Sequence, residues 1–92
     1  MFRSGEYFAL NVKGDSMTGG GIYDGDIAII KKQNTANNGE IIAALLTDEA
    51  TLKRLKVSGN KVQLLPDNPA YEPIIADNVT ILGKLIALFR KY

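Results

Sequence analysis

The sequence predicts a mostly β fold, a small β-sandwich or open barrel with one short helical turn near Ser16. Two observations predict it. Turn signals such as Asp-Gly, Asn-Gly and Ser-Gly recur every ten or so residues, and short runs of strand-forming residues lie between them. The chain has 92 residues, 46% of them hydrophobic, which is enough to bury one modest core. Residues 1–92 are therefore expected to form a single domain.

The first third of the chain is expected to contain two strands separated by a helical turn. Residues 7–13 are rich in strand formers and alternate between apolar and polar at their end, which predicts a strand. Asp15 or Ser16 is expected to cap one helical turn. The three glycines at 19–21 should end it, because each disfavours helix by about 1 kcal/mol. Residues 26–32 are the second predicted strand.

The rest of the chain is expected to consist of strands and turns. An alternative for residues 40–55 is a helix, because alanine and leucine are abundant there, but the Thr, Ile and Val content and the flanking turns favour strands. The three prolines predict an ordered surface loop over residues 66–73. Gly83 predicts a bulge or bend in the last strand. The strands predicted after residue 39 are 40–47, 51–57, 61–65 and 79–89.

The composition argues against several classes of function. There is no histidine and no cysteine, so we expect neither a zinc site nor a catalytic pair that uses imidazole or thiol. No phosphate-binding Gly-Lys-Ser/Thr loop occurs, and no cofactor is expected. Eleven basic against ten acidic residues give a net charge of +1, which argues against direct DNA binding. No run of about eighteen apolar residues predicts a membrane segment, and the missing cysteines fit a cytoplasmic protein.

Ser16 is the candidate nucleophile. Of the three serines, Ser4 lies near the N-terminus and Ser58 in a turn, whereas Ser16 lies between a strand and a helical turn. Backbone N–H groups at the start of a helical turn have no partner within it, so those near Met17 could stabilise an oxyanion. A serine after Gly-Asp is also an ordinary turn or capping residue, and that interpretation stays open.

Lys53 is the candidate base. A neutral amine near pH 7 requires its pKa to fall from the usual value of about 10.4 to about 7, which burial in an apolar site can produce. On an extended strand Thr51 and Lys53 point to one face, so the Thr51 hydroxyl is expected to direct the amine. Arg54 and Lys56 are then expected in solvent. Lys53 also fits an ordinary solvated strand face.

Three blocks of sequence, in the right order, resemble the self-cleaving serine peptidases of the LexA, UmuD and phage-repressor family. Together they cover nearly the whole chain. Residues 33–40 and 78–84 look most like LexA repressors of Gram-positive type. The blocks are GDSM at 14–17 with GIYDGD at 21–26, NNGE at 37–40 with EATLKR at 49–54, and LLPDNP at 64–69 with YEPI at 71–74 and ILGK at 81–84.

The resemblance implies a function. Ser16 would be the nucleophile and Lys53 the general base, and they would cut a bond in the repressor's own N-terminal cleavage segment without a metal or cofactor. A RecA filament on single-stranded DNA would stimulate this cleavage, which would relieve repression of DNA-damage genes in the SOS response. The protein would form a homodimer through its C-terminal strand, which here begins at Ile81 and ends at Arg90.

The chain also departs from the family. Fifteen residues precede Ser16 and no alanine is followed by glycine, the usual scissile pair, so we expect the DNA-binding domain and the cleavage segment to lie outside this chain. DNA would be bound only through that N-terminal domain. The glycines at 19–21 predict a loosely held turn. An alternative function is a UmuD-like accessory subunit of an error-prone DNA polymerase. A signal peptidase is disfavoured because no membrane anchor is found.

Overall fold

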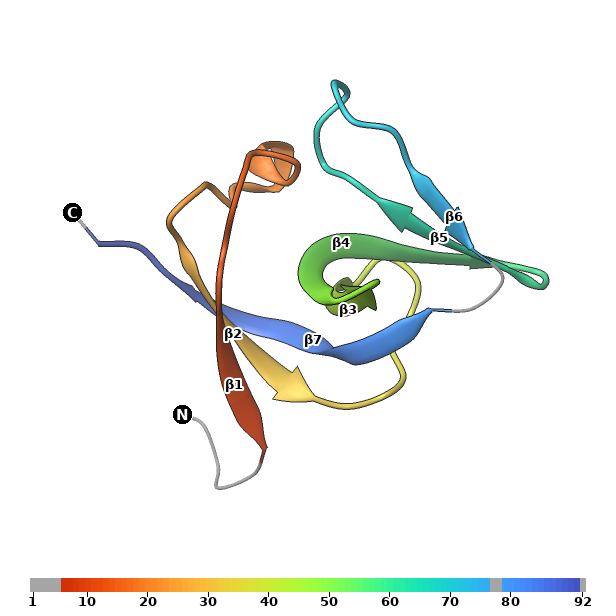
Figure 1. Cartoon of the computed structure of the whole chain (residues 1–92), viewed down its shortest axis with the longest axis horizontal. Helices are drawn as coiled ribbons and strands as arrows, with labels where there is room; N and C mark the ends of the chain where they lie inside the picture. The colour runs from red at the N-terminus through yellow and green to blue at the C-terminus, as the bar shows by residue number, and fades with distance from the viewer. Residues whose placement is uncertain (1–5, 77–78, 92) are drawn as a thin grey trace.

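The computed structural model describes residues 6–76 and 79–91, and these residues form one antiparallel sheet with one short 3₁₀ helix (Figure 1). The strand order is β1-β2-β7-β3-β4-β5-β6, so the C-terminal strand lies in the interior of the sheet. The elements are β1 (Tyr7–Asn11), η1 (Thr18–Gly20), β2 (Ile27–Lys32), β3 (Ile41–Leu46), β4 (Glu49–Ser58), β5 (Lys61–Leu65), β6 (Ile74–Ala76) and β7 (Thr80–Phe89).

The predicted mostly β fold is confirmed, and its architecture is a single open sheet that curves strongly along β4 (Figure 1). The helical alternative for residues 40–55 is wrong, because β3 and β4 form a hairpin whose register runs from Ile41 opposite Arg54 to Leu46 opposite Glu49. Strand β6 was not predicted. It has three residues and follows the proline-rich loop directly, which leaves too short a pattern to recognise.

Two hydrophobic clusters lie on opposite faces of β3. Ala43 belongs to the cluster that β1, β2 and β7 cover, whereas Ile42 and Ala44 belong to the cluster that β4 and β5 cover. Successive residues of a strand point to opposite faces, so a strand that is buried on both sides reads as a continuous apolar run. This explains the sequence IIAALL of β3. The curved sheet thus places β4, which carries Lys53, beside the core.

Gly83 lies where β7 passes very close to β2. A Cβ atom at this position would lie 2.3 Å from the carbonyl oxygen of Lys31 and 2.5 Å from Cγ2 of Ile30. The pairing of β7 shifts by one residue with each neighbouring strand. The shift with β2 lies between Ile29 and Ile30, and the shift with β3 lies between Ala43 and Ala44. The predicted irregularity near Gly83 is therefore confirmed, and its cause is the close approach of two backbones.

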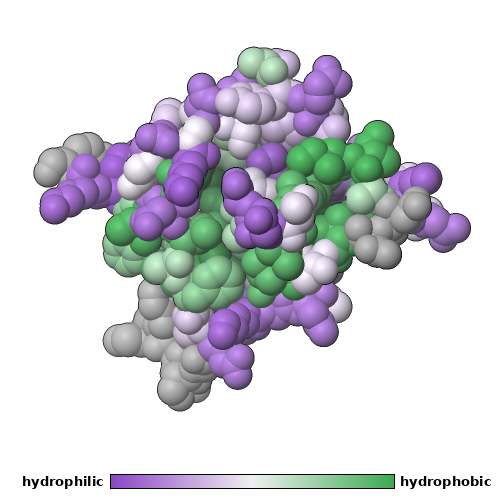
Figure 2. Space-filling view, viewed as in Figure 1, coloured by the Kyte–Doolittle hydropathy of each residue, from purple (hydrophilic) through white to green (hydrophobic). Residues whose placement is uncertain are grey.

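Apolar side chains also remain on the surface. The space-filling view shows apolar surface over β2 and β7 and a second area over β5 and β6 (Figure 2). Ile27 of β2 and Phe89 of β7 lie opposite each other and are 40% and 54% exposed, and Ile75 of β6 is 62% exposed. No helix in residues 6–76 and 79–91 is long and apolar enough to cross a membrane.

Candidate active site

Ser16 lies in the turn that leads from β1 to η1. Gly14 adopts a φ of +80°, a conformation that glycine tolerates, and its N–H donates to Oδ1 of Asp24 at 2.7 Å. The N–H of Val12 donates to the carbonyl oxygen of Asp26 at 2.8 Å, which extends the pairing of β1 with the segment before β2. These bonds fix the backbone on the N-terminal side of Ser16.

The helical turn begins after Ser16, so the prediction that Asp15 or Ser16 caps it is wrong. Met17 holds the cap position, and no side chain there makes a capping hydrogen bond with the helix backbone. The first two of the three glycines form the body of η1, and only Gly21, with a φ of +82°, ends it. Ser16 therefore lies in a turn that precedes the helix and is not part of it.

The structure brings Lys53 to Ser16 across 37 residues of sequence. Lys53 Nζ lies 3.1 Å from Ser16 Oγ, 2.8 Å from Thr51 Oγ1 and 3.1 Å from the carbonyl oxygen of Leu52. Three acceptors match the three protons of a charged ammonium group. When the amine is neutral, it has a lone pair that can accept the Ser16 proton. Ser4 lies outside the described residues, and Ser58 ends β4 on the exposed surface.

Lys53 is 8% exposed and has no carboxylate within ion-pair distance among the residues that the structure describes. Ile42 lies directly opposite it in the β3–β4 register. Burial lowers the pKa of the Lys53 amine below its ordinary value, and the negative charge of Glu49 opposes part of that effect. The direction of the shift is the one that a lysine base requires.

The two faces of β4 differ from the prediction in one respect. Thr51 and Lys53 share a face and a hydrogen bond, as expected from their spacing. Lys56 is exposed, but Arg54 is not simply in solvent. Arg54 is half-buried and forms an ion pair with Asp67 at 2.6 Å. The proline-rich loop, which contains Asp67, covers this face of β4. The sequence did not predict a partner for the Asp67 carboxylate.

Met17 secures the turn through its side chain, which is 3% exposed and belongs to the core cluster with Ile22. Its Sδ accepts a hydrogen bond from the N–H of Asp67 at 3.4 Å. The backbone N–H groups of Ser16 and Met17 donate to no acceptor within residues 6–76 and 79–91. Unpaired N–H groups beside a serine are the donors that an oxyanion requires.

The loop between β5 and β6 contacts the Ser16 turn through residues that were not assigned a role from the sequence. Asn68 Nδ2 donates to the carbonyl oxygen of Asp15 at 2.8 Å. The Tyr71 hydroxyl donates to the Asp15 carboxylate, and this bond raises the pKa of Tyr71. These partners are separated by more than 50 residues. No spacing in the sequence could have found them, although the loop belongs to the third block of the resemblance.

A groove is lined in part by Thr51. It has a volume of about 290 Å³ and lies between the end of β1 at residues 10–13 and the start of β4 at residues 48–52. Thr51, whose hydroxyl accepts the hydrogen bond from Lys53, lines it. Strand residues of β1 and β4 line the groove on two sides, and extended peptides can pair with exposed strands.

The sequence profile of the family described as peptidase S24-like matches residues 1–86 of the chain. The chain belongs to this family. Similar proteins include the LexA repressor of Caldicellulosiruptor saccharolyticus, which is 54% identical over 84 residues, with 91% of this chain and 42% of that protein covered. The LexA repressor of Bacillus velezensis is 53% identical over 92 residues, with 98% and 45% covered.

The LexA repressor of Clostridium botulinum strain Langeland is 47% identical over 87 residues, with 95% of this chain and 43% of that protein covered. The S24 chain thus spans less than half the length of the curated relatives that it matches. The resemblance to LexA repressors of Gram-positive type is confirmed by the Bacillus and Clostridium proteins. The chain is therefore a LexA-type S24 domain, and cleavage by Ser16 and Lys53 remains a prediction.

Proposed function

We propose that this chain is the autopeptidase and dimerisation domain of a LexA-type transcriptional repressor of the SOS response, with Ser16 as nucleophile and Lys53 as general base. One observation carries the proposal. The only hydrogen bond from a nearly buried lysine to a serine among the described residues joins Nζ of Lys53 to Oγ of Ser16, at 3.1 Å. A lowered lysine pKa and unpaired backbone N–H groups beside the serine support it.

The reaction proceeds in two steps. Neutral Lys53 takes the proton of Ser16 Oγ while that oxygen attacks the scissile carbonyl, and the N–H groups near Met17 stabilise the resulting oxyanion. Lys53 then gives the proton to the departing amine, which leaves an acyl-enzyme on Ser16. Lys53 then takes a proton from a water molecule that attacks the acyl carbonyl, the bond to Ser16 Oγ breaks, and Lys53 returns the proton to Oγ. Thr51 keeps the amine directed toward Ser16 through both steps.

The substrate is the repressor's own N-terminal cleavage segment, bound as an extended strand in the groove beside Thr51. A RecA filament stimulates cleavage, and DNA is bound through the repressor's separate N-terminal domain. Residues 1–92 form one domain that dimerises through the strand from Ile81 to Arg90 and acts in the cytoplasm. The support for these partners is the similarity to proteins named LexA repressor and the match to a peptidase family.

The test is cleavage of a supplied peptide that contains an Ala-Gly bond between apolar residues, measured at pH 7 and pH 10. The wild-type rate is expected to rise with pH, because deprotonation of Lys53 creates the base. Ser16→Ala and Lys53→Ala are each expected to lower the rate by about a thousandfold or more. Ser58→Ala, which changes an exposed serine, is the matched control. A rate that survives in both Ser16 and Lys53 variants would refute the dyad.

A further inference from the structure

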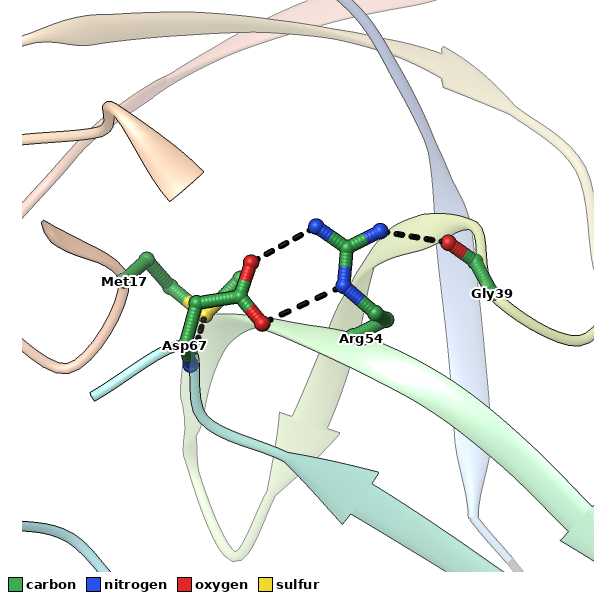
Figure 3. Close-up of polar contacts among 4 residues, drawn as sticks. All are labelled: Met17, Gly39, Arg54 and Asp67. Carbon is green, nitrogen blue, oxygen red and sulfur yellow. Dashed lines mark hydrogen bonds and ion pairs between the residues drawn. The ribbon is translucent and has the colours of Figure 1, made fainter. Parts of the chain in front are cut away.

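Arg54 and Asp67 connect the strand that carries Lys53 to the turn that carries Ser16 (Figure 3). We propose that this ion pair is a positioning device, which holds the Ser16 turn at hydrogen-bonding distance from Lys53. The inference rests on the proposed roles of Ser16 and Lys53. It adds a residue pair that acts on the reaction only through the placement of the nucleophile.

The first link joins Asp67 to β4. Arg54 Nε donates to Asp67 Oδ1 at 3.1 Å and Nη2 donates to Oδ2 at 2.6 Å, so the pair is bidentate. Nη1 donates to the carbonyl oxygen of Gly39 at 2.6 Å, which fixes the guanidinium from its other side (Figure 3). Two parallel bonds define the orientation of the carboxylate as well as its distance. Asp67 is therefore held in a fixed position relative to Lys53, the residue before Arg54.

The second link joins Asp67 to the nucleophile turn through the backbone. The N–H of Gly19 donates to the carbonyl oxygen of Asp67 at 2.6 Å. In the opposite direction the N–H of Asp67 donates to Sδ of Met17 at 3.4 Å. Both contacts lie within three residues of Ser16. The same loop residue thus contacts β4 with its side chain and the Ser16 turn with its main chain.

Gly19 and Gly20, which follow the nucleophile, form the contact between the Ser16 turn and Asp67. A Cβ atom at Gly19 would lie 2.4 Å from the Asp67 carbonyl oxygen, and one at Gly20 would lie 2.6 Å from Asp67 Oδ2. Only glycine allows the loop to approach this closely. The prediction of a loosely held turn is therefore wrong, because the small residues bring the turn against a fixed neighbour.

Proton transfer between Ser16 and Lys53 depends steeply on their separation, and a misplacement of 1 Å can slow a reaction about a hundredfold. A partly exposed ion pair contributes little to overall stability. Loss of the Arg54–Asp67 pair is therefore expected to change the reactivity of Ser16 much more than the stability of the fold. This difference separates a positioning role from a structural one.

The probe for the test is a fluorophosphonate ester. Ser16 Oγ forms a bond to phosphorus, fluoride leaves, and the hydroxyl proton passes to Lys53. We expect Arg54→Gln and Asp67→Ala each to slow this reaction at least tenfold at saturating probe, at every pH from 7 to 10. The double variant should be no slower than the slower single variant, because each single substitution already removes the Arg54–Asp67 ion pair. Arg54→Lys, which keeps the charge but not the planar fork, should be intermediate.

The control is Lys84→Gln, which removes the 2.5 Å ion pair between Lys84 and Glu40, a pair in which Asp67 and the Ser16 turn take no part. It should react at the wild-type rate. For each variant we would measure the melting temperature and the hydrogen-exchange rate of the Gly19 amide. Asp67→Ala should melt at the wild-type temperature, but its Gly19 amide should exchange faster than that of the wild type. A wild-type rate in Asp67→Ala, or losses that multiply in the double variant, would overturn the positioning role alone. A wild type in which Ser16 does not react would overturn the proposed function and the positioning role together.

Discussion

At the scale of single residues, Lys53 is buried without a carboxylate partner in the described part of the chain, a costly arrangement for a charged amine. The pKa of Lys53 is lowered in the folded state, so the unfolded chain holds more protons between that pKa and the ordinary value of 10.5. The stability of the folded protein therefore rises with pH across this window. The amine destabilises the fold most when it is protonated.

Replacement of Lys53 by methionine is therefore expected to stabilise the fold while it abolishes cleavage. Methionine has a similar shape and no charge, so the gain at pH 7 should be about 0.5 to 2 kcal/mol, the usual size of a stabilising change at a functional site. The gain should shrink as the pH rises through the lowered pKa of Lys53, because the wild-type amine then loses its charge. Urea unfolding at pH 7 and pH 10 measures it, and a variant that is less stable than wild type at pH 7 would contradict this account.

At the scale of the elements, β7 depends on the close approach at Gly83. Gly83→Ala is expected to destabilise the fold by about 1 to 3 kcal/mol, because the new Cβ atom meets the backbone of Lys31 and cannot be accommodated by a side-chain rotation. Ile86→Ala, on the exposed surface of the same strand, is the control and should cost less. Chemical denaturation measures both. Equal stability of Gly83→Ala and wild type would show that β2 and β7 can separate at no cost.

The elements also show what a sequence can predict. Strand β5 has the predicted bounds at residues 61–65, because two turn signals enclose a short strand-forming run. The shared face of Thr51 and Lys53 follows from the two-residue period of a strand. The contacts of Asp67 did not follow, since its partner Met17 lies 50 positions away, its partner Arg54 lies 13 positions away, and both contacts depend on how the loop folds back. The predicted cap at Ser16 was wrong because tertiary contacts hold the turn instead.

At the scale of the whole molecule, the proposed dimer can use the end of β7 that carries Phe89, because among the described residues this strand pairs with β2 along Gly83–Phe89 but with β3 only along Thr80–Lys84. Ile27 and Phe89 lie opposite each other in neighbouring strands and are exposed, and apolar surface extends over β2 and β7 (Figure 2). The net charge of +1 adds little repulsion between two copies. An exposed apolar patch on a chain with little net charge favours self-association.

Phe89→Glu is therefore expected to convert the proposed dimer to a monomer. A buried aromatic anchor is worth about 2 kcal/mol or more at an interface, and a carboxylate in its place must also be desolvated. The dissociation constant, measured by sedimentation equilibrium, should rise at least about thirtyfold. Ile75→Glu changes an even more exposed apolar residue on β6 and should leave it unchanged. If Ile75→Glu dissociates the dimer and Phe89→Glu does not, two copies meet through the β6 edge, and β7 serves only as an interior strand.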